Sequence, residues 1–260
     1  MPSSLPLLVF TDLDGTLLDH ESYDWSPARP ALEALRELGS GLVLASSKTA
    51  AEIAPLRQAV GFTTWPAIVE NGAGRLEPGE DGSATGGDHQ AILDALATLP
   101  GHIRNRFQGF SEMSVDDVVA CTGLPAEDAE RARARRYSEP GLWSGDEAGR
   151  EAFTTQLKGN GVSARMGGRF LTLSLGQTKA DRMREIVQDA APKLTVALGD
   201  APNDIEMLEA ADIGVVVANP ASTPLPELPG EAAGRIRRTH LAGPAGWNRA
   251  ILDIISELKS

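Results

Sequence analysis

Two aspartates one residue apart, Asp12 and Asp14, follow an apolar run in this 260-residue chain and precede Gly15. Residues 7–10 predict a buried strand, and the acidic turn closes at its carboxyl end. Alternation along an extended chain puts both carboxylates on the same side. Two close carboxylates repel unless a cation lies between them or one keeps its proton. The pattern therefore predicts a site for a hard divalent cation, or an acid beside a nucleophile.

A second apolar run, residues 195–198, ends in Gly199 and Asp200 and is followed by Asn203 and Asp204. Either motif alone could be an acidic surface turn or a helix cap. Together they favour a catalytic or ligand-binding site, because the carboxyl ends of strands in an open α/β sheet form the edge where ligands bind. Mg²⁺ takes oxygen ligands and keeps several waters, so a few carboxyl groups and a substrate phosphate would suffice to bind it.

Two weaker signals accompany these motifs. Ser46 opens a run of hydroxyl residues after the predicted strand 42–45, at a helix start where free N–H groups attract phosphate. The alternative is helix capping, because Thr49 and Glu52 form a capping-box pattern. Lys179 stands at the start of the helix before the second acidic motif, and most lysines in such a position are simply solvated.

The order of expected elements divides the chain into three parts. Strands and helices alternate over residues 1–82, which predicts a parallel sheet with helices on its faces. Residues 83–175 mix helices with short strands, as an inserted α+β module would. Within them we expect a strand at 103–107 and a helix at 126–136 that carries exposed ion pairs. The first pattern returns over residues 176–260 and ends in an amphipathic helix.

Charge and cysteine content limit the kinds of partner. The formal charge is −12, from 24 Lys and Arg against 36 Asp and Glu, which argues against binding nucleic acid or an anionic membrane. Cys121 is the only cysteine, so no intrachain disulfide can form, and its apolar neighbours suit a small packed residue in a helix. The first apolar run is short and follows no basic residue, so we expect neither a signal peptide nor a membrane span. A cytoplasmic location is the expectation.

Taken in order, the motifs resemble those of the haloacid dehalogenase superfamily of phosphotransferases. The matching positions are residues 12–16, Ser46, Lys179 and residues 199–204. The long segment between the second and third motifs resembles the insertion of the Cof-type branch, whose members carry a large α+β cap at this place. The resemblance implies an α/β fold with a Rossmann-like parallel-sheet core and an inserted α+β cap domain.

Further segments look like the mannosyl-3-phosphoglycerate phosphatase family, which serves the synthesis of the compatible solute mannosylglycerate. They are residues 46–49, 68–73, 137–140, 167–170 and 243–248. This resemblance implies a phosphatase that acts on mannosyl- or glucosyl-3-phosphoglycerate. The alternatives are a broader sugar-phosphate phosphatase, a phosphosugar mutase that returns the phosphate to another hydroxyl, and a protein that keeps the fold for binding alone. The full acidic set argues against the last, because clustered charges are costly to keep.

The resemblance also implies roles for the motif residues. Asp12 would attack phosphorus and form an aspartyl-phosphate intermediate. Asp14 would protonate the leaving oxygen and then deprotonate the water that hydrolyses the intermediate. Ser46 and Lys179 would place a hydroxyl and a cation against the phosphoryl group. These four residues are the expected catalytic set.

Metal and substrate contacts complete the implied site. Mg²⁺ would be held by Asp12, by Asp14 through its backbone carbonyl and by Asp200, with Asn203 and Asp204 in supporting roles. The partner would be a small phosphorylated sugar-glycerate, bound by a monomer or homodimer. An exposed hairpin with solvated arginines is the alternative for most of the expected substrate contacts, which are Lys48, Asn71, Glu139, Arg165, Gly167, Gly168 and Arg169.

Overall fold

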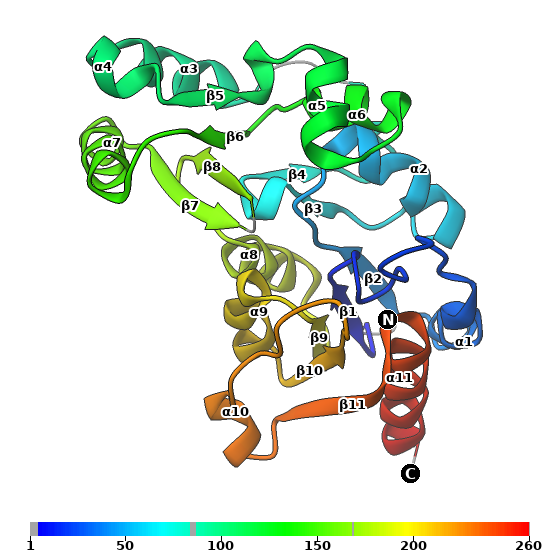
Figure 1. Ribbon diagram of the computed structural model, residues 1–260. Coiled ribbons are helices and arrows are strands. Elements are labelled where there is room, and N and C mark those ends of the chain that lie inside the picture. The colour runs from blue at the N-terminus through cyan, green and yellow to red at the C-terminus, as the bar shows by residue number, and fades with distance from the viewer. Residues whose placement is uncertain (1–4, 84–86, 168, 260) are drawn as a thin grey trace.

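The computed structural model describes residues 5–83, 87–167 and 169–259. Five parallel strands form one sheet in the order β11-β10-β9-β1-β2, and we call the part built on it the core (Figure 1). Because β1 lies between β2 and β9, the segments that follow these three strands meet at one edge of the sheet. The strands are β1 (Leu8–Thr11), β2 (Gly41–Leu44), β9 (Thr195–Gly199), β10 (Ile213–Ala218) and β11 (Ile236–Ala242).

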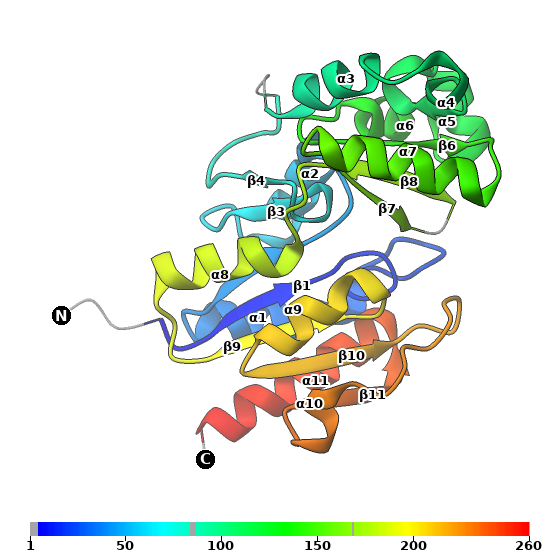
Figure 2. The same ribbon diagram turned by 90° about the vertical axis from the view of Figure 1, so that its left-hand side faces the viewer.

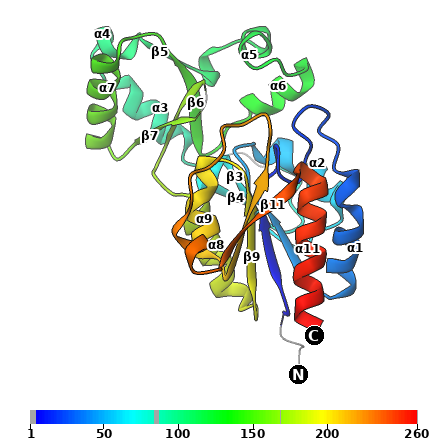
Figure 3. The ribbon, with the colours of Figure 1, turned by 60° about the horizontal axis from the view of Figure 1, so that its bottom comes forward.

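Helices cover both faces of this sheet (Figure 3). α1 (Arg29–Glu37) and α11 (Gly243–Lys259) pack on one face, and α8 (Lys179–Ala190) and α9 (Ile205–Ala210) on the other. Since both sides of the strands are buried, β1 and β2 are apolar throughout except for Thr11 and Gly41, as expected of a parallel sheet covered by helices.

The first half of the core also contains α2 (Ala50–Val60) and a hairpin of β3 (Ala67–Val69) and β4 (Gly74–Leu76). α2 begins at the predicted capping box, in which Thr49 accepts from the backbone N–H of Glu52 and the Glu52 side chain accepts from that of Thr49. Its helical run stops at Gly61, whose φ of 79° is left-handed. The hairpin carries the chain away from the sheet edge.

A second, antiparallel sheet has the order β5-β6-β8-β7, and we call the part built on it the cap (Figure 2). Two separate apolar clusters lie among its helices and strands. Its strands are β5 (Phe107–Gly109), β6 (Ser138–Trp143), β7 (Ser163–Gly167) and β8 (Phe170–Ser174). Its helices are α3 (His89–Ala97), α4 (Gly101–Arg104), α5 (Val115–Thr122), α6 (Ala126–Arg133) and α7 (Glu147–Gly159).

Several cap elements differ from the sequence-based expectation. Residues 103–107 do not form one strand, because α4 ends at Arg104 and β5 begins at Phe107. The helix expected at 126–136 ends at Arg133, and the chain then turns into β6. β6 was not expected, since it contains Pro140 and Gly141, two residues that disfavour strands. Pairing with β5 and β8 on both sides overrides that preference.

The architecture agrees with the predicted α/β class, a parallel sheet with helices on both faces and an α+β part beside it. β11 and the short helix α10 (Pro229–Ala232) extend the core beyond the elements expected from the sequence. Cys121 lies half-buried in α5, where it packs against an apolar cluster of the cap. Among the described helices, none combines the length and apolarity needed to cross a bilayer.

Candidate active site

The Lys179 side chain joins the two acidic motifs at the carboxyl edge of the core sheet. Its ammonium lies 2.6 Å from Asp12 Oδ1 and 2.7 Å from Asp204 Oδ1, and all three side chains are buried. Lys179 is the first residue of α8, whose N-cap Thr178 forms a capping box with Asp181. Three segments far apart in the sequence therefore place one cation between two carboxylates.

Burial dominates the electrostatics of this cluster. It raises the pKa of Asp12 well above its usual range, with Lys179 opposing the shift and Asp204 adding to it. Burial by itself would lower the pKa of Lys179, but the Asp12 and Asp204 carboxylates outweigh it and raise that pKa. Lys179 is therefore a firmly charged ammonium. A divalent cation beside Asp12 would in turn favour the ionised carboxylate.

Asp200 lies at the same edge and is oriented by two donors. The Thr16 hydroxyl donates to its Oδ1 at 2.7 Å, and the Asn219 side-chain amide donates to its Oδ2 at 2.8 Å. Burial raises the pKa of Asp200, while these two hydrogen bonds oppose the shift. Gly15 has a φ of 83°, and a Cβ there would lie 2.2 Å from Asn219 Nδ2. Glycine at position 15 thus allows the loop after β1 to approach the loop that carries Asn219.

Asp14 faces Lys48 rather than Lys179. Its Oδ2 lies 3.2 Å from the Lys48 ammonium, which also lies 5.2 Å from the centre of the Tyr23 ring. Burial would lower the pKa of Lys48, but Asp14 and other neighbours outweigh it and raise that pKa. Asp14 Oδ1 is buried and accepts no hydrogen bond from the described residues. An orphaned buried acceptor is rare, and here it leaves one oxygen of Asp14 available to a ligand.

Ser46 follows Ala45, the bridge residue that comes after β2, and its side chain is buried. Its backbone N–H donates to Ile68 O at 3.0 Å, and its carbonyl accepts from the N–H of Asn71 at 2.9 Å. The hydroxyl oxygen accepts from the N–H of Lys48 at 3.2 Å, which leaves the hydroxyl proton for another acceptor. Asn71 in turn accepts a hydrogen bond from the Asn203 amide at 2.9 Å.

Three carboxylates in this cluster lie close enough together to share a metal ion. Asp12, Asp200 and Asp204 each bring one oxygen within 4.8 Å of the others. Asp204 is already bound at both oxygens, since Lys179 donates to its Oδ1 and the N–H groups of Asp200 and Ala201 donate to its Oδ2. Asp12 and Asp200 keep lone pairs for a ligand, and their hard oxygens suit Mg²⁺. Asp204 fits better as the residue that holds Lys179.

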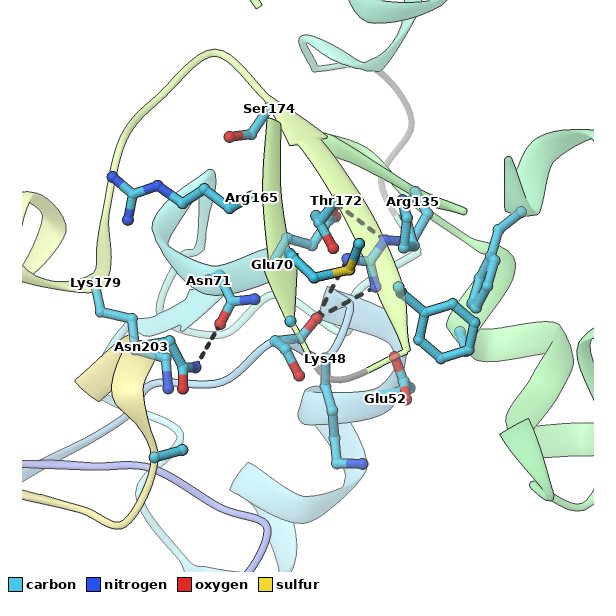
Figure 4. A pocket seen from close by; sticks show the side chains of 18 of the residues that line it. Lys48, Glu52, Glu70, Asn71, Arg135, Arg165, Thr172, Ser174, Lys179 and Asn203 are labelled. Atoms are coloured by element: carbon cyan, nitrogen blue, oxygen red, sulfur yellow. Dashed lines mark hydrogen bonds and ion pairs between the residues drawn. The ribbon is translucent and has the colours of Figure 1, made fainter. Parts of the chain in front are cut away.

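A cavity of about 790 Å³ opens beside this cluster, between the core and the cap (Figure 4). Lys48 and Lys179 line it and connect it to Asp14 and Asp12. Its core side is mainly polar, and its cap side mixes apolar residues with polar ones such as Arg135, Arg165 and Thr172. The core side includes Ser47, Glu52, Glu70, Asn71, Thr178 and Asn203, and the apolar residues of the cap side include Phe110, Leu124, Ala132, Pro140, Met166 and Phe170.

The expected substrate contacts divide into two groups. Those that line the cavity are Lys48, Asn71, Arg165 and Gly167. Glu139 does not reach it, which corrects the expectation that this carboxylate meets a sugar hydroxyl. It is fully buried within the cap, where His89 Nε2 and the Ser111 N–H and hydroxyl approach its oxygens. Arg169 is exposed and is not a lining residue, although its guanidinium donates to the carbonyl of Thr122, which lines the cavity, at 3.4 Å. Gly168 lies outside the described residues.

Several residues of the site had no role assigned from the sequence. Arg135 was expected on an exposed helix, yet its buried side chain lines the cavity and lies 3.4 Å from Glu70. The acid-Asn-Gly turn at residues 70–72 was visible in the sequence, but nothing there indicated a partner 65 residues away. The two residues that orient Asp200, Thr16 and Asn219, were also missed. Thr16 lies within the first acidic motif, but nothing in the sequence around Asn219 indicated a role at the site.

Solved structures of similar fold cover nearly the whole chain. A phosphatase of the haloalkanoate superfamily from Bacteroides thetaiotaomicron is 20% identical with a TM-score of 0.68, and the match covers 98% of this chain and 97% of that one. Sucrose-phosphatase from Synechocystis, in complex with sucrose and phosphate, is 18% identical with a TM-score of 0.62, covering 98% of each chain. A subclass IIB sugar phosphatase is 20% identical with a TM-score of 0.64, covering 95% of this chain and 98% of that one. At these identities the likeness shows a shared fold.

A family model supplies the closer comparison. The model of the haloacid dehalogenase-like hydrolases matches residues 9–99 and 150–224, more than half of the chain. The matched segments contain both acidic motifs, Ser46 and Lys179. They flank residues 100–149 of the cap, which the family model does not match, and residues 1–8 and 225–260 are also outside the match. The chain belongs to the haloacid dehalogenase-like hydrolases.

Proposed function

We propose that this protein is a Mg²⁺-dependent phosphatase that works through an aspartyl-phosphate intermediate. One observation carries the proposal: the Lys179 ammonium bridges Asp12 and Asp204, with Asp14 and Asp200 at the same sheet edge. Such a set offers a nucleophile, an acid, a cation and ligands for a metal within one small volume. Membership of the hydrolase family supports the reaction class.

In the first step Asp12 attacks phosphorus with one carboxylate oxygen. A bond forms between that oxygen and phosphorus, and the bond from phosphorus to the leaving oxygen breaks. Asp14 gives its proton to the leaving oxygen, so the product departs as a neutral alcohol. Asp14 Oδ1 accepts no hydrogen bond from the described residues, which supports this role, because the oxygen is free to exchange a proton with the leaving oxygen.

In the second step Asp14 accepts a proton from a water molecule, which attacks the phosphorus of the intermediate. The bond between Asp12 and phosphorus breaks, and the Asp12 carboxylate is restored with release of inorganic phosphate. Lys179 and the Ser46 hydroxyl would bind the phosphoryl oxygens in both steps. Asp204 would keep Lys179 in place, and Asn203 would support the adjoining loop through Asn71.

The metal would be held by Asp12, Asp200 and the backbone carbonyl of Asp14. When bound, Mg²⁺ supplies positive charge that neutralises the phosphoryl oxygens as the negative carboxylate approaches. Thr16 and Asn219 would orient Asp200 for this task, as the outer partners of metal ligands commonly do.

For the substrate we propose mannosyl-3-phosphoglycerate or glucosyl-3-phosphoglycerate, with residues 83–175 acting as the cap domain between the core segments 1–82 and 176–260. The cavity of about 790 Å³ has the size of a small-molecule site. Lys48 and Arg165 on its walls offer cations for a glycerate carboxylate, and Asn71 offers hydrogen bonds for sugar hydroxyls. The fold is similar to that of sucrose-phosphatase, which was solved with sucrose and phosphate bound. Sucrose consists of two linked units, and a glycosyl glycerate would be a leaving group of the same kind.

The test is phosphate release from a panel containing mannosyl- and glucosyl-3-phosphoglycerate, free 3-phosphoglycerate and common hexose phosphates. Turnover concentrated on the two glycosyl compounds is the expected result. Weak turnover spread over the panel would remove the named substrate and keep a broader phosphatase. Conversion of a hexose phosphate to its isomer without phosphate release would indicate a mutase instead.

A further inference from the structure

Two adjacent residues, Glu70 and Asn71, hold the backbone of the loop that carries Ser46. The N–H of Glu70 donates to Lys48 O and the N–H of Asn71 donates to Ser46 O, each at 2.9 Å. Both residues are left-handed, with φ values of 52° and 59°, although neither is glycine. Consecutive strained residues of this kind persist only where the surroundings enforce them, and they concentrate at functional sites.

The Glu70 carboxylate is buried and faces the cap. It accepts hydrogen bonds from the backbone N–H groups of Arg136 at 2.9 Å and Tyr137 at 3.2 Å, and from the Ser138 hydroxyl at 2.7 Å. Arg136 and Tyr137 lie in the segment that connects α6 to β6, and Ser138 is the first residue of β6. Glu70 therefore joins the Ser46–Lys48 loop to the cap, by its backbone on one side and its side chain on the other.

Arg135 completes the connection from the cap side (Figure 4). Its Nε lies 3.4 Å from Glu70 Oε2, and its guanidinium donates to Ser47 O at 3.3 Å and to Ser138 Oγ at 2.8 Å. The side chain is only 6% exposed. The loop between Ser46 and Lys48 is thus held at each of its three carbonyls, two by the backbone of residues 70–71 and one by a cap arginine.

We propose that Glu70 and Arg135 are positioning residues that set the geometry of Ser46 and Lys48 according to the position of the cap. The inference rests on the proposed phosphatase function. In this arrangement the Ser46 hydroxyl and the Lys48 ammonium, which pairs with Asp14, reach their places only when the segment 135–138 is docked on Glu70. Leaving-group recognition by the cap is thereby coupled to phosphoryl-group chemistry in the core.

The proposal is tested with Glu70→Gln and Arg135→Lys. Gln presents an amide N–H to donors that need an acceptor, and Lys keeps the charge but loses the planar set of donors. Because misplacement of reacting groups lowers the chemical step, we expect kcat to fall about tenfold or more in both variants. KM on the best substrate should change by less than about threefold, since uniform binding is retained.

Glu209→Gln is the matched control. Glu209 also accepts a backbone N–H, from Gly230, and pairs with Arg235, but it lies away from the cavity. Glu209→Gln should lower the melting temperature, because it weakens these contacts, without changing kcat. If Glu70→Gln and Arg135→Lys behave like this control, with normal kcat for the folded protein, the proposal is wrong. A rise in KM with unchanged kcat would also overturn it, because both residues would then act by holding substrate.

A second measurement does not depend on any substrate. Amide hydrogen exchange of Arg135→Lys should show faster exchange at Glu70 and Asn71, whose N–H groups hold the Ser46–Lys48 loop. Unchanged protection at these two amides would overturn the coupling, whatever the enzyme hydrolyses. Absence of phosphatase activity in the unaltered protein, together with faster exchange in the variant, would instead reject the proposed function and retain the coupling between cap and loop.

Discussion

The ammonium of Lys179 lies 2.6 Å from Asp12 Oδ1, although the two residues are 167 positions apart in the chain. This contact joins the segment after the first strand to the helix that follows the cap. Both side chains are buried, so the loss of one partner leaves the other charge without its counter-ion. The folding of the core and the chemistry of the site therefore depend on the same pair of charges.

Replacement of Lys179 by Met should destabilise the protein strongly. It leaves Asp12 and Asp204 as neighbouring buried carboxylates without their cation, for which we expect a loss of about 3–5 kcal/mol in the free energy of unfolding. Urea denaturation without added metal measures this. The control is Lys158→Met, at an exposed position in α7. Equal stability of the two variants would show that the ion pair contributes nothing.

Replacement of Asn219 by Ala should weaken metal binding without removing a ligand. The Asn219 amide fixes Asp200 Oδ2, and loss of such an outer partner typically lowers metal affinity by about 10- to 100-fold. Calorimetric titration with Mg²⁺ gives the affinity directly, and the Mg²⁺ concentration for half-maximal turnover gives it independently. Asn160→Ala in the cap serves as the control. An affinity equal to that of the control would exclude Asp200 as a ligand that Asn219 orients.

Glu231 should contribute a pH-dependent increment of stability. Hydrogen bonds from Arg238, with that from the Leu228 N–H, hold the pKa of Glu231 at about 2, below its usual 4.5. A carboxyl with a lowered folded-state pKa stabilises the protein above its unfolded-state pKa, and this contribution is lost as the pH falls through the folded-state value. Glu231→Gln should therefore be less stable than the unaltered protein at neutral pH.

The difference in unfolding free energy between the two proteins should narrow as the pH falls from 4.5 toward about 2. Urea denaturation curves recorded across this range measure it. A difference that is constant with pH would mean that Glu231 acts through packing and not through its charge.

The core motifs could be predicted because their chemistry is local. The apolar run and the acidic residues that follow it are consecutive in each motif, so each motif can be recognised without knowledge of its contacts. The capping boxes at Thr49 and Thr178 likewise lie within four residues. β3 (Ala67–Val69) is likewise local, because a short apolar run precedes the turn-forming residues Asn71 and Gly72. Alternation of strands and helices then sufficed to bring Asp12 and Asp200 to one edge of a sheet.

The rest could not be predicted because it depends on contacts between distant segments. β6 contains Pro140 and forms a strand only because β5 and β8 pair with it. Arg135 has the composition of a surface arginine, and only the approach of Glu70 from the core makes it a buried one. Glu139 looked like a polar cavity residue, but Ser111 and His89 surround it within the cap.

The most direct test of the central claim compares the unaltered protein with Asp12→Asn in an assay of phosphate release, with and without Mg²⁺. We expect Mg²⁺-dependent release by the unaltered protein and a fall of roughly a thousandfold or more in the variant, because its amide cannot serve as the nucleophile. Circular dichroism should show that the variant keeps its fold. Substantial phosphate release by folded Asp12→Asn would contradict the account.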